Sequence, residues 1–153
     1  RTDTKLKTDG FQMSKEAADE MFDILKGEWE SASVDYGRHG IITSKFTFAR
    51  LNDHLVMSDN LLPQSILILR YDSRTKYVNF HRFHIDQPEG IFVYSGRVVR
   101  RKDSNEIIFF RRTPKEDGWT TYRFDGPDKV TMVDSKFINR KNVTLHRVKQ
   151  GSE

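Results

Sequence analysis

The hydrophobic pattern of this chain changes its period once, close to residue 27. Before that point the apolar positions follow helical spacing, at Ala17, Met21, Ile24 and Leu25, with Phe22 beside them. Ser14 is placed to cap the helix start, and Gly27 follows the last apolar residue, where a helix end favours a residue without Cβ. The pattern therefore predicts one amphipathic α-helix over residues 14–26.

After Gly27 the apolar positions alternate with polar ones, as they do in half-buried strands. Strand-like segments follow one another up to residue 148, separated by short turns rich in Gly, Pro, Asn and Asp. We expect an all-β fold, an antiparallel up-and-down β-barrel of about 8–10 strands with one N-terminal α-helix. Residues 14–149 would form the single barrel domain, with a flexible N-terminal tail at 1–13 and a short C-terminal tail at 150–153.

Composition narrows the classes of function. The chain has no cysteine, which excludes disulfides and thiolate chemistry and fits either the cytoplasm or a bacterial exported, periplasmic protein. No apolar run approaches the roughly 20 residues of a membrane span. The 26 basic and 22 acidic residues are mixed at strand ends and turns, so the formal charge of +4 indicates a solvated rim and no nucleic-acid surface.

Three short motifs resemble a known group of β-barrels. They are Leu25-x-Gly27-x-Trp29, then Leu69-x-Tyr71-Asp72 followed by Thr75-Lys76-Tyr77, and Gly90-x-x-x-Tyr94-x-Gly96. Together they are similar to the lipocalin or calycin superfamily, in particular to the bacterial DUF1579 family of uncharacterised lipocalin-like domains. The resemblance implies that Trp29 packs across the closed end of the barrel, beside Gly27 and near a basic residue of the last strand, here Arg147. It implies no catalytic chemistry.

The strands also suggest where a ligand would bind. In the segment 77–85, Val78, Phe80, Arg82 and His84 share one face, which mixes apolar walls with polar anchors as binding pockets do. The candidate ligand-binding residues are Phe46, Phe80, Arg82, His84, Tyr94, Arg97 and Phe110. Arg82 or Arg97 would suit an acidic head group. The partner we expect is a small hydrophobic or amphipathic molecule.

Other functions remain open on the sequence alone. The barrel would be an enzyme if a cavity-facing histidine, His84 or His81, acted as an acid or base. It would be a protein-interaction or assembly module, such as a homodimer, if the barrel were solid and an outer sheet face paired with itself. No catalytic motif or cofactor motif is apparent in the sequence. No metal site is apparent either, because His81 and His84 fall on opposite faces of their strand and cannot form a ligand pair.

Overall fold

The computed structural model describes residues 11–35, 38, 40–60, 64–85, 91–101, 105–112, 117–134 and 142–149. It confirms the predicted fold: ten antiparallel strands close an up-and-down barrel behind one short helix, α1 (Lys15–Leu25). The barrel strands are β1 (Gly27–Ser31), β4 (Lys45–Leu51), β5 (His54–Asp59), β6 (Ser65–Asp72), β7 (Tyr77–His84), β8 (Ile91–Arg100), β9 (Glu106–Arg112), β10 (Asp117–Phe124), β11 (Lys129–Asp134) and β12 (Val143–Arg147).

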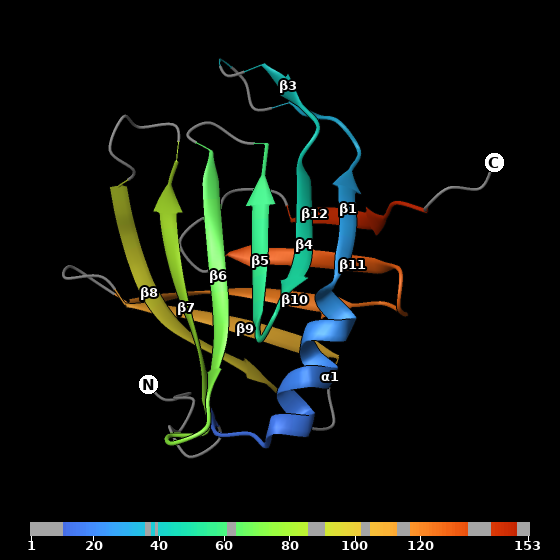
Figure 1. The fold of residues 1–153 in the computed structure, drawn as a ribbon. Coiled ribbons are helices and arrows are strands. Elements are labelled where there is room, and N and C mark those ends of the chain that lie inside the picture. Colours follow the sequence, from blue (N-terminus) through green and yellow to red (C-terminus); the bar gives the residue numbers. More distant parts are fainter. Residues whose placement is uncertain are drawn as a thin grey trace, which may run out of the picture.

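Closure of the sheet depends on the first strand. β1 pairs with β12 on one side and with β4 on the other, while every other neighbour in the barrel follows in chain order. Between β1 and β4, the short strands β2 (Val34–Asp35) and β3 (Ile41–Ile42) form a separate two-stranded ribbon. Figure 1 shows β4 to β8 running lengthwise, β9 to β12 crossing behind them, and α1 at the end opposite the ribbon.

The helix forms where the pattern predicts it. The Ser14 hydroxyl accepts a hydrogen bond from the Ala17 amide at 3.1 Å, and the Lys26 amide donates to the Phe22 carbonyl where the helix ends. The fully buried stripe is formed by Ala18, Met21, Phe22 and Leu25. The buried alanine is therefore Ala18 and not the expected Ala17, because the stripe follows the i, i+3, i+4, i+7 spacing from Ala18.

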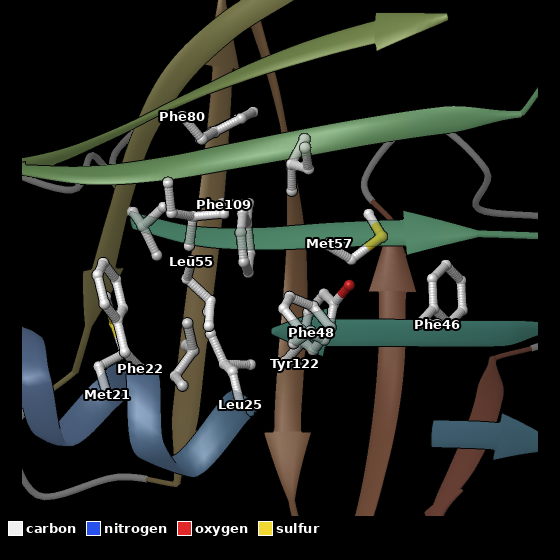
Figure 2. Close-up of a cluster of buried hydrophobic side chains, with 14 of the residues drawn as sticks. Met21, Phe22, Leu25, Phe46, Phe48, Leu55, Met57, Phe80, Phe109 and Tyr122 are labelled. Carbon is white, nitrogen blue, oxygen red and sulfur yellow. The ribbon is translucent and has the colours of Figure 1, made fainter. Parts of the chain in front are cut away.

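The helix packs into the interior of the barrel at its end. Figure 2 shows Met21, Phe22 and Leu25 pointing from the helix toward Leu55, and Phe48 and Phe80 belong to the same buried cluster. Aromatic rings continue this core, with Phe80 and Phe109 in edge-to-face contact at 5.5 Å. We call this the closed end of the barrel, and the opposite end the mouth.

Within the described residues, no helix has the length and hydropathy that crossing a bilayer requires.

Gly27, Trp29 and Arg147 meet at the closed end. The Arg147 guanidinium lies 4.2 Å from the centre of the Trp29 ring, and Arg147 pairs with Trp29 across β1 and β12. The same guanidinium donates to the carbonyl oxygens of Ile24 and Lys26, where the helix ends. Gly27 has φ of +126°, and a Cβ there would lie 2.6 Å from Nη1 of Arg147, so both the backbone and the neighbouring cation require glycine.

The segment before the helix contacts the barrel from residue 11 onward. Phe11 is buried against Phe110, and the Met13 amide donates to the Lys76 carbonyl at 2.9 Å. The last residues of the expected N-terminal tail, 11–13, are thus held against the strands. Residues 1–10 of that tail and the expected C-terminal tail at 150–153 lie outside the described residues.

Candidate functional site

The inner face of the barrel changes from apolar to polar along its axis. At the closed end the inward residues are apolar, and at the mouth the next inward position in each of several strands is polar. The inward series from closed end to mouth are Leu55, Met57, Asp59 in β5; Leu69, Leu67, Ser65 in β6; Val78, Phe80, Arg82 in β7; Ile107, Phe109, Arg111 in β9; and Phe124, Tyr122, Thr120 in β10. Antiparallel pairing brings these polar residues to the same end.

Asp59 and Arg82 form the first half of this site. The Asp59 side chain is fully buried, and one of its oxygens accepts a hydrogen bond from the Ser65 amide at 3.2 Å. Its other oxygen lies 3.5 Å from Nη2 of Arg82, and Nε of Arg82 donates to the Ser65 hydroxyl at 3.1 Å. Ser65 and Asp59 therefore fix the Arg82 guanidinium inside the barrel.

Arg111 forms the second half. Its Nη1 donates to the Thr120 hydroxyl at 3.1 Å, and the side chain is buried. Gly118 makes room for it, because a Cβ on Gly118 would lie 2.7 Å from Nη2 of Arg111. The guanidinium carbons of Arg82 and Arg111 lie 5.8 and 6.0 Å from the centre of the Tyr94 ring. Both cations thus face one aromatic ring.

A small irregularity of the sheet accompanies the site. The pairing of β7 with β8 sets Tyr94 opposite Arg82, and the register shifts between Arg82 and Phe83. Bulges of this kind bend a strand and re-aim its side chains, and they are frequent beside binding sites. Here the register shift follows directly after Arg82, which is paired with Tyr94.

Tyr122 adds a hydroxyl at the boundary between the apolar and polar halves. Burial raises the pKa of Tyr122 well above its usual range, so the phenol stays protonated. The Arg82 guanidinium acts in the opposite direction, whereas Tyr94 and the Asp59 carboxylate add to the increase. The Tyr122 ring packs against Phe109 at 5.1 Å, which holds it between the core and the charged groups.

Five of the seven ligand-binding candidates lie on the inner face. Phe46 and Phe80 belong to the core, Tyr94 packs against it, and Arg82 is in the polar group. His84 pairs with the inward-facing Ser65 in the β6–β7 register and so takes the same face. His81, the other histidine considered as an acid or base, is exposed and pairs with Ile68 and Ser95 on the neighbouring strands.

The other two candidates lie on the outer face. Arg97 stacks over the Tyr77 ring at 3.8 Å, and Phe110 stacks on Phe11 at 5.0 Å. Phe110, Val99 and Ile108 belong to a second apolar cluster that is separate from the barrel core. The structure therefore does not bring Arg97 or Phe110 into the barrel with Arg82.

The sequence analysis missed the residues that complete the polar group, namely Asp59, Ser65, Arg111, Thr120 and Tyr122. The signal was present in the alternation, since Asp59 and Arg111 each extend a stripe of two apolar residues at a spacing of two. Arg82 extends such a stripe in the same way. A search for strands in which the inward stripe ends on a polar residue would have selected all three.

The arrangement is chemically suited to holding an acidic group. It offers guanidinium donors, hydroxyl groups and an aromatic ring inside a barrel whose other end is covered by the helix. The described residues contain no group of three His, Cys, Asp or Glu side chains that could hold a metal ion. Comparisons with protein-family models, with curated proteins and with solved structures found no match to this chain.

Proposed function

We propose that this protein is a non-enzymatic binding protein for a small amphipathic molecule, whose acidic group is bound by Arg82 and Arg111 inside the mouth of the barrel. The observation that carries the proposal is the pair of inward guanidinium groups that face the ring of Tyr94. An acidic ligand at the mouth would add charge-assisted hydrogen bonds to these two guanidinium groups.

Arg82 has donors left for such a ligand. A guanidinium group has five N–H donors. Among the described residues Arg82 directs one donor to the Ser65 hydroxyl and one toward Asp59, and 24% of its side chain remains exposed. A carboxylate entering from the mouth can therefore reach Arg82 without breaking its bonds to Ser65 and Asp59.

The apolar part of the ligand would be short. The closed half of the barrel is filled by fully buried side chains, including Phe48, Leu55, Leu69 and Phe80. An apolar tail would then lie against the rings of Phe46 and Tyr94 near the mouth, where one ring is buried and the other is partly buried. The proposed ligand class is a small acid with a compact apolar portion.

The test compares two ligands of equal length that differ in charge. Isothermal titration of the full chain with octanoate and with octanol at neutral pH should give tighter binding of octanoate, by about tenfold or more. A hydrogen bond to a charged group contributes about 1.5–3 kcal/mol, and 1.4 kcal/mol is about tenfold in affinity. Equal affinity for the two ligands, or no binding of octanoate, would refute the proposal.

Variants locate the site. Arg111→Met should weaken octanoate binding by about tenfold and leave octanol binding unchanged, because it removes a cation and retains an apolar side chain. Arg97→Met is the matched control, since Arg97 lies on the outer face over Tyr77. If both variants weaken octanoate equally, binding occurs by overall charge and not in the barrel.

A further inference from the structure

A pocket lies at the closed end of the barrel, away from the polar residues of the mouth. It has a volume of about 390 Å³ and is open to solvent. Its walls come from α1, from the turn between β4 and β5, from the end of β6 and from the turn that follows β6. They include the aromatic residues Phe22 and Tyr71 and several charged side chains. A pocket of this size accommodates a small organic molecule.

Two of its carboxylates are already satisfied by the protein. Asp19 accepts from Lys15 at 2.9 Å and from Arg50 at 2.8 Å, and these bonds lower the pKa of Asp19. Asp72 accepts from the backbone amide of Arg74 at 2.9 Å, which likewise lowers the pKa of Asp72. Asp19 links α1 to β4 through Arg50, and Asp72 is held within its own turn.

Arg70 and Asp53 differ from them. Both are exposed and line the pocket, and within the described part of the chain neither forms an ion pair or a side-chain hydrogen bond. The β5–β6 register sets Arg70 opposite His54, the residue that directly follows Asp53. One cation at the end of β6 and one anion in the turn before β5 therefore line the same pocket, each with open hydrogen-bonding positions.

We propose that this pocket binds a small zwitterion with an apolar substituent, such as a free aromatic amino acid. Its carboxylate would accept hydrogen bonds from Arg70, its ammonium group would donate to Asp53, and its ring would lie against Tyr71. A ligand with only a negative charge is repelled by Asp53, and one with only a positive charge is repelled by Arg70. The two charges of an α-amino acid lie close together, as do Arg70 on β6 and Asp53 in the turn that leads into β5.

The site is independent of the proposed function at the mouth. It is built from the helix and the hairpin turns of the closed end, whereas Arg82 and Arg111 line the mouth. The pocket at the closed end and the polar group at the mouth share no residue. Failure of either proposal is recognised separately, because the two ligands would perturb different residues.

The experiment is a titration of the isotopically labelled full chain, followed by amide proton–nitrogen NMR spectra. The probes are L-phenylalanine, phenylacetate, which lacks the ammonium group, and phenethylamine, which lacks the carboxylate. L-phenylalanine should give saturable shifts at the amides of Asp53, Arg70 and Ser73, with no comparable shifts at Gly96 and Gly118 near the mouth. At these three amides each of the other probes should bind at least about tenfold more weakly, because each retains one unfavourable charge contact there; shifts of phenylacetate confined to the mouth report the other site.

Substitutions at the surface then test the two charges. Arg70→Gln and Asp53→Asn should each weaken L-phenylalanine binding by about tenfold, and neither removes a packed side chain because both residues are exposed. Arg123→Gln is the control, since Arg123 is also exposed but pairs with Glu106 elsewhere. The proposal is overturned if no probe gives saturable shifts at the pocket. It is equally overturned if phenylacetate or phenethylamine shifts the amides of Asp53, Arg70 and Ser73 with the affinity of L-phenylalanine, or if Arg123→Gln weakens L-phenylalanine binding as much as Arg70→Gln.

Discussion

Replacing Arg147 should destabilise the whole barrel, because this side chain joins the helix, the first strand and the last strand. Its guanidinium donates to the carbonyl oxygens of Ile24, at 2.9 Å, and of Lys26, and it stacks on Trp29 at 4.2 Å. It also donates to Asp128 at 3.0 Å. Three quarters of the Arg147 side chain is buried, since 25% is exposed, so these contacts are weakly screened by solvent.

The expected loss for Arg147→Ala is about 3 kcal/mol in the free energy of unfolding. A hydrogen bond from a charged donor contributes about 1.5 kcal/mol or more, and a cation over an aromatic ring about 0.5–1 kcal/mol. The cation also interacts favourably with the partial negative charge at the helix C-terminus, which adds about 0.5 kcal/mol to the expected loss. Arg147→Lys should lose less, because it keeps the charge but not the forked donors that reach two carbonyl groups.

Urea unfolding followed by circular dichroism measures this loss. With a slope of about 2 kcal/mol per molar urea, Arg147→Ala should lower the midpoint by about 1.5 M. The control is Arg123→Ala, which removes an exposed arginine with a single ion pair and should cost less than about 1 kcal/mol. If the two alanine variants shift the midpoint equally, the helix-end carbonyl groups are satisfied without Arg147 and the reasoning fails.

Three further predictions concern the barrel wall, the mouth and the helix. Gly96→Ala should cost about 3 kcal/mol or more in urea unfolding, because its Cβ would lie 1.7 Å from the carbonyl oxygen of Phe110; an unchanged midpoint would mean that β8 and β9 separate easily. Arg82→Met should cost about 3–5 kcal/mol, since it leaves the buried Asp59 carboxylate without its cation, and adding Asp59→Asn should restore much of that loss. Asp19→Asn should flatten the pH dependence of the urea midpoint below about pH 4. The pKa of Asp19 is lowered by its bonds to two basic side chains, so its contribution is present above its ordinary pKa and is lost as pH falls through the folded value; an unchanged pH profile would contradict this.

The sequence alone determined the elements and their order. The change of period at Gly27 located one helix and the start of the strands, because helices and strands place successive side chains differently. The absence of helices between strands, together with short turns, favoured antiparallel neighbours and an up-and-down barrel. These are local properties, and the observed helix and strand order agree with them.

The sequence did not determine which face of every strand points inward. In β9, Ile107 and Phe109 face the core, while Ile108 and Phe110 are equally apolar on the other face. The outer face of β9 accommodates the apolar ring of Phe110 because Phe11, almost one hundred residues earlier in the chain, stacks on it. Alternation cannot distinguish the two faces of a strand when each is covered, so it does not show that Phe110 faces outward. Arg97 is three residues from Tyr94 on the same strand, so its outward position follows once Tyr94 is known to face inward.

Only the tertiary structure decided which polar residues meet. Asp59, Ser65 and Arg82 each end or begin an inward stripe, but their contact depends on the register of β5, β6 and β7. The contact of Arg111 with Thr120 likewise depends on the pairing of β9 with β10, within a sheet that β1 closes. Register and closure arise from pairing between distant segments, whose energies no local pattern contains, and both proposed sites depend on them.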